Sequence, residues 1–389
     1  MPRQLAAGFF IKESMNLSDY DYQFPQDAIA MYPPEKRGTT KLFVVNTQTG
    51  EIEIDQYENL DKHLTAQDVL VRNITKVFHA RLFGMAINKT GQSGKQVEVF
   101  FTEPHAQSLE EYARRQYDPK EKGYKLEFLT ALRGIRLDSI RYIDFGDNLR
   151  LKKISKNNDS LTGILYKTDS DFSVEELFTM FEQKGKVPLP PYIKRSTVVS
   201  DDERYQTIFA EKLGSVAAPT ASLNFTKTLE ARLAKQGTAI AEVTLHVGRG
   251  TFMPLRHERI EDNILHSEPY FVKNSTITAL HLAKQDQKRI IAMGTTTTRT
   301  LESIAPQILD ANTSHDILSE TKLFVYPPFR FKIVDGLLTN FHFPRSSLIT
   351  LVDAFLQYKR SKLSWRTIYE FAMKNEARLF SYGDSMLIL

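Results

Sequence analysis

The hydrophobic positions from residue 168 onward fall into two kinds of pattern. Short apolar runs at 240–247, 288–294 and 337–341 have the length and continuity of buried strands. Segments with helical spacing lie between and after them, at 173–183, 226–237, 295–305 and 346–358. Thr226 is suited to cap its helix, and Gly237 is suited to end it. Strands that alternate with helices predict a layered α/β domain.

The stretch from residue 68 to residue 167 has a different pattern. Short runs of strand-forming residues alternate with turns made of Gly, Asn and Asp, which is typical of a small antiparallel sandwich or barrel. We therefore predict an α/β main domain formed by residues 17–67 and 168–389. Residues 68–167 are predicted to be inserted into it as a small antiparallel β-barrel domain. Residues 1–16 are expected to form a loose N-terminal extension.

Local signals support a folded segment before the insertion. Pro25 suits the first turn of a short helix that runs through residue 30. The apolar runs 41–45 and 51–54 flank a turn rich in Asn, Thr and Gly, which predicts a β-hairpin. The main domain is therefore expected to begin before the insertion and to continue after it.

The composition excludes several kinds of chemistry. The 389 residues include no cysteine, which excludes disulfides, thiolate metal sites, iron–sulfur clusters and a cysteine nucleophile. No apolar run reaches the roughly 18 residues that a membrane span needs, and the first residues lack the features of a signal peptide. We expect a cytoplasmic protein without a membrane segment.

Positive charge is concentrated in the predicted insertion. The whole chain has a formal net charge of +4, whereas residues 68–167 contain 18 lysines and arginines against 12 aspartates and glutamates. An excess of cations favours an anionic partner. The alternative is a solvated surface whose charge asymmetry has no function.

The threonine-rich turn after the run 288–294 is a candidate ligand site. A strand there gives way to a helix, where free backbone N–H groups can bind an anion. Thr295 and Thr296 add hydroxyl groups, and Arg299 adds a fixed positive charge. The alternative interpretation is an ordinary helix cap.

Three positions offer titratable groups. His246 ends an apolar run before a glycine turn, and Glu268 follows His266 at a spacing of two residues. His342 lies between aromatic residues before a proline. Each histidine can act as an acid or a base, or can be a structural residue in a packed loop. No HExxH spacing is present, and we predict no metal site.

Nine segments of the chain follow one another in the order of a known family. The segments are DYDYQFPQDAIAMYP, NITKVFHARLFG, PLPPYIKR, RYQTIFAEKLGSVAAPTASLNF, TLHVGRGTFMPLR, ILHSE, GTTTTRTLES, FVYPPFRFKIVDGLLTNFHFPRSSLITLVDAF and SYGDSMLI. Through them the chain resembles the S-adenosylmethionine:tRNA ribosyltransferase-isomerase family of queuosine biosynthesis, over roughly residues 17 to 389. This resemblance implies an α/β main domain with an inserted β-barrel, in agreement with the hydrophobic pattern.

The resemblance also implies a reaction. The ribosyl part of S-adenosylmethionine, a cosubstrate here, is transferred to a 7-aminomethyl-7-deazaguanine base at the wobble position of tRNA. Epoxyqueuosine forms, and adenine and methionine are released. The sulfonium acidifies the neighbouring ribose carbon, so the reaction needs a base, and adenine leaves best when an acid protonates it. His246, Glu268 and His342 are the candidates for these proton transfers.

The resemblance further suggests which residues bind the substrates. Arg299 and the turn with Thr295 and Thr296 are candidates for the methionine carboxylate or a phosphate, and Arg81 and Lys76 for the tRNA backbone. Further substrate-binding candidates in the matching segments are Thr220, Ser222, Asn224, Asp335, Tyr382 and Asp384. A monomer is expected.

The chain departs from the family pattern at several positions. Ser222 replaces a glycine, and Asn224 and Asn263 replace histidines. Less common residues also occur at Ile74, Lys76 and His79. If the missing histidines transferred protons, activity would fall by roughly 10²- to 10⁴-fold. Two alternatives follow: a divergent paralogue that binds tRNA or a nucleoside without the full reaction, and an unrelated α/β enzyme acting on a phosphorylated metabolite.

Overall fold

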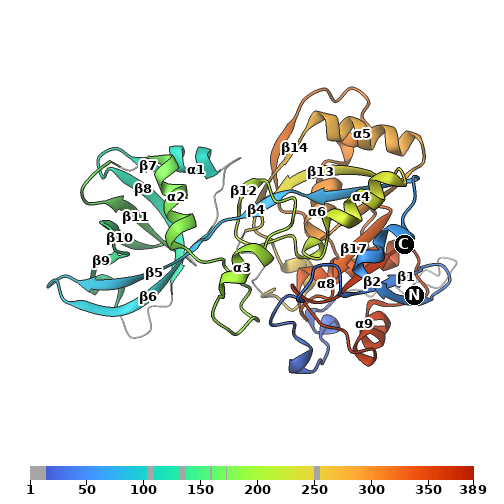
Figure 1. The fold of residues 1–389 in the computed structure, drawn as a ribbon, viewed down its shortest axis with the longest axis horizontal. Coiled ribbons are helices and arrows are strands. Elements are labelled where there is room, and N and C mark those ends of the chain that lie inside the picture. Colours follow the sequence, from blue (N-terminus) through green and yellow to red (C-terminus); the bar gives the residue numbers. More distant parts are fainter. Residues whose placement is uncertain (1–14, 103–108, 131–135, 158–159, 172, 249–254) are drawn as a thin grey trace, which may run out of the picture.

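A large α/β body and a smaller β-barrel make up the computed structural model (Figure 1). It describes residues 15–102, 109–130, 136–157, 160–171, 173–248 and 255–389. Residues 1–14 of the expected N-terminal extension therefore lie outside the described residues. None of the described helices is long and apolar enough to cross a membrane.

The large body is built on a nine-stranded mixed sheet. Its strand order is β16-β14-β13-β3-β15-β17-β18-β1-β2. The strands are β1 (Lys41–Val45), β2 (Ile52–Gln56), β3 (Asp68–Asn73), β13 (Ala239–Leu245), β14 (Glu268–Val272), β15 (Arg289–Met293), β16 (Ile317–Thr321), β17 (Gly336–Asn340) and β18 (Ser385–Ile388). The four central strands β13, β3, β15 and β17 run parallel, so their carboxyl ends meet at one edge of the sheet.

Helices cover both faces of this sheet, as a layered α/β domain requires. They are α4 (Lys227–Lys235), α5 (Asn274–Gln285), α6 (Thr295–Ser303), α7 (Ala305–Leu309), α8 (Ser347–Tyr358) and α9 (Trp365–Lys374). Successive strand residues point to opposite faces: Leu70 and Ile291 pack with α4, whereas Val71 and Ala292 pack with α5, α6 and α8. The predicted α/β class is confirmed.

Several predicted elements are present with small shifts at their ends. The predicted strands at 240–247, 288–294 and 337–341 correspond to β13, β15 and β17, and β1 and β2 form the expected hairpin. The Thr226 hydroxyl caps α4 by accepting a hydrogen bond from the Leu229 N–H at 3.0 Å. The short helix at Pro25 is a 3-10 turn, Gln26–Ala28.

The smaller body is an antiparallel sheet closed into a barrel. Its order is β11-β10-β9-β5-β6-β8-β7, and pairing of β11 with β8 closes it. The strands are β5 (Arg81–Asn88), β6 (Ser93–Phe101), β7 (Tyr117–Asp118), β8 (Gly123–Thr130), β9 (Ile140–Asp144), β10 (Leu149–Asn157) and β11 (Ser160–Lys167). Helices α1 (Leu109–Gln116) and α2 (Val174–Lys184) accompany it, and Leu177 and Phe181 of α2 join its core.

The beginning of the barrel differs from the expected boundary at Asp68. Strand β3 lies in the centre of the large sheet, between β13 and β15. All six of its residues are buried, because a central parallel strand is covered on both faces. Strands β4 (Thr75–Val77) and β12 (Lys212–Ser215) then form a short parallel ribbon between the two bodies.

Candidate active site

A cavity of 840 Å³ opens at the carboxyl edge of the central strands. Its lining includes Val247 after β13, Gly294 after β15 and Asn340 at the end of β17. In open α/β sheets ligands bind beyond the carboxyl ends of the strands, and the volume suits a small organic ligand. The cavity is therefore the candidate active site.

Polar side chains from different segments meet on one wall of this cavity. The Thr220 hydroxyl donates a hydrogen bond to Asn340 Oδ1 at 2.8 Å, and Asn340 Nδ2 donates to the Asp384 carbonyl at 3.2 Å. Thr295 and Thr296, in the first turn of α6, also line the cavity. The predicted positions Thr220, Thr295 and Thr296 therefore lie together at the candidate site.

Asn73, at the end of β3, organises this edge and was missed by the sequence analysis. Its Oδ1 accepts hydrogen bonds from the backbone N–H groups of Leu245 at 3.0 Å and Thr75 at 3.1 Å. Its Nδ2 donates to the Leu245 carbonyl at 3.0 Å and to Thr296 Oγ1 at 3.2 Å. A single amide thus ties β13, β4 and α6 together. The available signal was a polar residue at the end of an apolar strand.

His342 is the predicted histidine that lines the cavity. Its Nε2 lies 2.8 Å from Thr339 Oγ1, and its backbone N–H donates to the Tyr369 hydroxyl at 2.9 Å. Burial away from water lowers the pKa of His342 to about 3. The imidazole is therefore neutral at physiological pH, where it can form hydrogen bonds but accepts a proton only weakly.

His246 lies beside the cavity rather than in its lining. Its Nδ1 is 2.8 Å from Thr75 Oγ1, which belongs to the ribbon strand β4. Its ring also covers Gly214 of β12, where a β-carbon would come within 2.7 Å of the ring. The ribbon between the two bodies thus holds this histidine in place. Residues 249–254 of the glycine turn that follows lie outside the described residues.

Glu268 and Arg299 form a buried ion pair with each other. Glu268 Oε1 also accepts a hydrogen bond from the Gly248 N–H at 3.0 Å, and Arg299 Nε donates to the Leu323 carbonyl at 2.9 Å. Both line a separate cavity of 30 Å³ rather than the large one. The geometry therefore does not support the expected role of Arg299 as a clamp for a ligand carboxylate, because an internal carboxylate occupies it.

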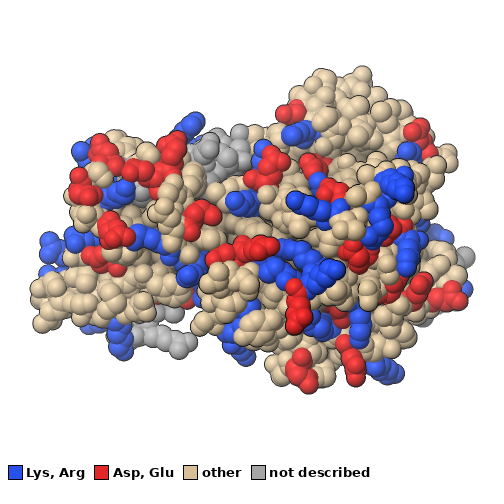
Figure 2. All heavy atoms as spheres, viewed as in Figure 1, with Lys and Arg blue, Asp and Glu red and all other residues tan. Residues whose placement is uncertain are grey.

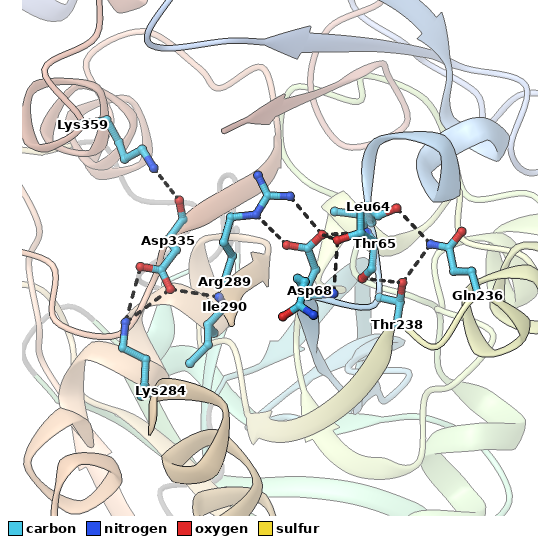
Figure 3. A network of polar contacts seen from close by, with 11 residues as sticks. Leu64, Thr65, Asp68, Gln236, Thr238, Lys284, Arg289, Ile290, Asp335 and Lys359 are labelled. Atoms are coloured by element: carbon cyan, nitrogen blue, oxygen red, sulfur yellow. Dashed lines mark hydrogen bonds and ion pairs between the residues drawn. The ribbon is translucent and has the colours of Figure 1, made fainter. Parts of the chain in front are cut away.

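Asp335 lies at the opposite edge of the sheet, where β15 begins (Figure 3). Its Oδ2 accepts from the Ile290 N–H at 2.9 Å and lies 3.3 Å from Lys284 Nζ, while Lys359 Nζ donates to its carbonyl at 2.9 Å. The predicted substrate-binding role does not fit this position. Asp335 instead joins the start of β15 to α5 and the end of α8.

Tyr382 and Asp384 are likewise buried in internal contacts. The Tyr382 hydroxyl donates to Asp201 Oδ1 at 2.9 Å. The Asp384 carboxylate accepts from the backbone N–H groups of Lys41 and Arg378, both at 2.8 Å. Neither side chain lines the large cavity. Both positions therefore support the walls of the site rather than its lining.

The positions that depart from the family pattern also lie outside the lining of the cavity. Ser222 is fully buried with a hydroxyl that has no hydrogen-bond partner among the described residues, and Asn224 is buried next to it. Asn263 Oδ1 accepts from the N–H groups of Arg256 and His257 at 2.8 and 3.0 Å, and its Nδ2 donates to the carbonyls of His257 and Arg259, both at 2.9 Å. Asn263 thus closes a loop, and the three changes leave the described lining intact.

Several cations of the barrel are paired with carboxylates. Arg81 binds Glu98 through two hydrogen bonds of 2.7 and 2.8 Å, and Arg150 binds Asp144 at 3.0 Å. Figure 2 shows acidic and basic side chains intermingled over the barrel, at the left of this face. Lys76, half-buried in β4, forms no ion pair among the described residues. Charges of both signs are therefore mixed on this face of the barrel.

One group of side chains has the spacing to hold a metal ion within the described part of the chain. It consists of Glu53, Asp55 and His63, whose ligand atoms lie within 4.8 Å of one another. Asp55 and His63 already contact each other at 3.0 Å. None of the three lines the large cavity, so the candidate active site does not include this group.

Known proteins resemble this chain over nearly its whole length. The family described as "Queuosine biosynthesis protein" matches residues 17–388. The S-adenosylmethionine:tRNA ribosyltransferase-isomerase of Chlorobium phaeovibrioides is 38% identical over 374 residues, covering 96% of this chain and 100% of the relative. That of Halothermothrix orenii is 39% identical over 376 residues, with the same coverage.

The chain is also similar to a crystal structure of S-adenosylmethionine tRNA ribosyltransferase from Thermotoga maritima. The two chains share 28% sequence identity with a TM-score of 0.49, and the match covers 95% of this chain and 100% of that chain. The match to the family and the identity to its members extend through both the α/β body and the barrel. The chain therefore belongs to the queuosine biosynthesis family that contains the S-adenosylmethionine:tRNA ribosyltransferase-isomerases.

Proposed function

We propose that this protein is an S-adenosylmethionine:tRNA ribosyltransferase-isomerase. It transfers and isomerises the ribosyl part of S-adenosylmethionine onto 7-aminomethyl-7-deazaguanine at the tRNA wobble position, giving epoxyqueuosine and releasing adenine and methionine. The observation that carries the proposal is the identity of 38–39% to enzymes of this name over 96% of the chain. A cavity of 840 Å³ at the carboxyl edge of the sheet is consistent with it.

The residues of the cavity suit this chemistry in distinct ways. The first turn of α6 presents backbone N–H groups and the hydroxyls of Thr295 and Thr296, which favour the methionine carboxylate. Thr220 and Asn340 form a hydrogen-bonded wall that can orient ribose or base groups. The sulfonium of the cosubstrate acidifies the adjacent ribose carbon, which calls for a base. His342 is the histidine of the described lining, but its pKa of about 3 makes it a weak proton acceptor, so it suits a hydrogen bond to the substrate better than proton abstraction.

The remaining predicted residues take supporting roles in this proposal. His246 borders the cavity through its neighbour Val247, and Glu268 fixes Gly248 in the turn that follows. The partner is tRNA, and the protein acts as a monomer in the cytoplasm. No carboxylate occurs among the cavity-lining residues that the structure describes, which favours an anionic substrate over a cationic one at the rim.

The test is turnover by the purified protein. Incubation with S-adenosylmethionine and tRNA carrying the 7-aminomethyl-7-deazaguanine base should give epoxyqueuosine in the nucleoside mass spectrum, together with free adenine and methionine. The variant Ser222→Gly with Asn224→His should have similar turnover, because neither residue lines the cavity. If the natural protein has no turnover and the two changes restore it, the result would instead support a paralogue without the full reaction.

A further inference from the structure

An aromatic cluster forms part of the rim of the large cavity. Phe343 packs against Phe24, Tyr192 and Phe380, with ring centroids 6.0, 6.0 and 5.2 Å away. Its ring is nearly parallel to that of Tyr192, at 13°. All four rings line the cavity, yet the Phe343 side chain remains 44% exposed. One part of this ring is therefore supported by its neighbours, and the rest faces solvent.

The exposed position of Phe343 is held by the backbone around it. The carbonyl of His342 accepts a hydrogen bond from the Tyr22 hydroxyl at 2.7 Å. The Arg345 N–H donates to the Tyr20 carbonyl at 3.0 Å, and the Ser346 hydroxyl donates to the Phe343 carbonyl at 2.7 Å. Burial of a phenylalanine ring is favourable, so a ligand that covered the exposed part of this ring would be stabilised by the contact.

Two cations accompany the aromatic ring at the rim. Lys194 lines the cavity, is exposed, and forms no ion pair among the described residues. Arg345 also lines it and lies 3.1 Å from Glu258 and 3.9 Å from Asp21. Carboxylates are absent from the described lining. The rim thus combines an exposed aromatic surface with one cation, Lys194, that has no carboxylate partner among the described residues.

Aromatic rings next to cations are the features that bind single-stranded nucleic acid, since bases stack on the rings and phosphates contact the cations. We propose that the exposed surface of Phe343 stacks an unpaired nucleobase of the RNA that flanks the nucleotide entering the cavity, and that Lys194 contacts the adjoining phosphate. This inference rests on the proposed function, because it takes the RNA partner from there. It assigns a site for a neighbouring nucleotide in addition to the reacting base.

The occupant is an RNA base rather than the cosubstrate or a second protein copy. The Phe343 surface lies at the solvent-exposed rim, whereas the polar wall of Thr220 and Asn340 offers the hydrogen bonds that a small cosubstrate requires. A protein partner would gain little from a single exposed ring beside an unpaired lysine. A nucleotide uses both features at once.

The test measures binding of an anticodon stem-loop RNA to the full chain without S-adenosylmethionine, so that it is independent of turnover. Phe343→Ala should weaken binding about 5- to 100-fold, and Phe343→Tyr should retain affinity. Tyr358→Ala is the matched control, because Tyr358 is a 42% exposed aromatic residue at the end of α8, near Asp335 at the opposite edge. Lys194→Gln should reduce the slope of log Kd against log salt by about 0.7 to 1.

An RNA stem-loop with an abasic flanking nucleotide identifies the stacked base. It should bind the natural protein more weakly, and Phe343→Ala should cause little further loss with it. Equal losses for Phe343→Ala and Tyr358→Ala, or an unchanged Kd in Phe343→Ala, would overturn the inference. Normal turnover by the natural protein would then leave the proposed function standing. Weakened RNA binding by Phe343→Ala in a protein without turnover would support the inference and refute the proposed function.

Discussion

The hydroxyl of Thr75 and Nδ1 of His246 lie 2.8 Å apart, joining the ribbon that leads to the barrel with the end of a central strand. The imidazole also covers Gly214, whose backbone has a φ of +155°. Two neighbouring strands of the ribbon therefore enclose the histidine next to the cavity.

Gly214→Ala tests this arrangement. A β-carbon would meet the His246 ring at 2.7 Å, so we expect a loss of about 1–3 kcal/mol in the free energy of unfolding and a lower kcat. Chemical denaturation and turnover measure the two effects. Gly146→Ala is the control, because Gly146 also has a positive φ but has no atom within 4 Å of the new carbon. Equal behaviour of the two variants would contradict the proposed contact.

The Arg299–Glu268 pair should contribute to stability more than to ligand binding. Removing one partner, as in Glu268→Leu or Arg299→Met, leaves a buried charge alone and should cost about 3–5 kcal/mol of unfolding free energy. The double replacement should recover much of that loss. Chemical denaturation of the natural protein and the three variants gives the coupling free energy between the two side chains. A rise in KM for S-adenosylmethionine in Arg299→Met without a loss of stability would instead assign the arginine to the ligand.

His342 should make stability depend on pH in the acid range. Burial lowers its folded pKa to about 3, below the ordinary value of 6.5, so the unfolded chain binds the extra proton between these two pH values. Its contribution is complete above pH 6.5 and is lost as the pH falls towards 3, at up to about 1.4 kcal/mol per pH unit. His342→Gln should remove this part of the pH dependence of the unfolding free energy, as measured by chemical denaturation at a series of pH values. The difference in unfolding free energy between the natural protein and His342→Gln should therefore change from pH 7 to pH 4. A constant difference over this range would contradict a buried neutral imidazole.

Asn263 should be a structural residue. Its side chain satisfies the N–H groups of Arg256 and His257 in one loop, so Asn263→Ala should lower the unfolding free energy by about 2–4 kcal/mol. Asn263→His should also be destabilising, because a ring cannot make the same set of bonds. Asn312→Ala, at an exposed turn, is the control. A stable Asn263→His variant with increased kcat would show that the position serves proton transfer.

The sequence predicted the α/β class and the central strands because their apolar runs are continuous and their neighbours carry clear caps. It placed β3 in the barrel, because a short run such as that at Val69–Val71 has the same length in either sheet. Its position depends on pairing with β13 and β15, which are distant in the chain. Contacts over such distances are not contained in local patterns.

Only some of the residues that line the cavity could be expected from the sequence, because the lining also depends on contacts between distant segments. Thr220, Thr295, Thr296 and His342 lie in segments whose residue types indicate ligand contacts, and they line the cavity. Arg299 and other buried polar residues have the same residue types but find partners inside the protein, as the Glu268 contact shows. Only the folded structure separates a polar group that faces the cavity from one that supports its wall.

The most direct measurement is nucleoside mass spectrometry of substrate tRNA after incubation with S-adenosylmethionine and either the natural protein or Asn340→Ala. Asn340 lies in the cavity wall and contacts Thr220 at 2.8 Å. The natural protein should produce epoxyqueuosine, and the variant should retain its fold by circular dichroism but lose at least roughly tenfold in rate. Absence of epoxyqueuosine with the natural protein, or an undiminished rate in the variant, would contradict the assignment of this reaction to this cavity.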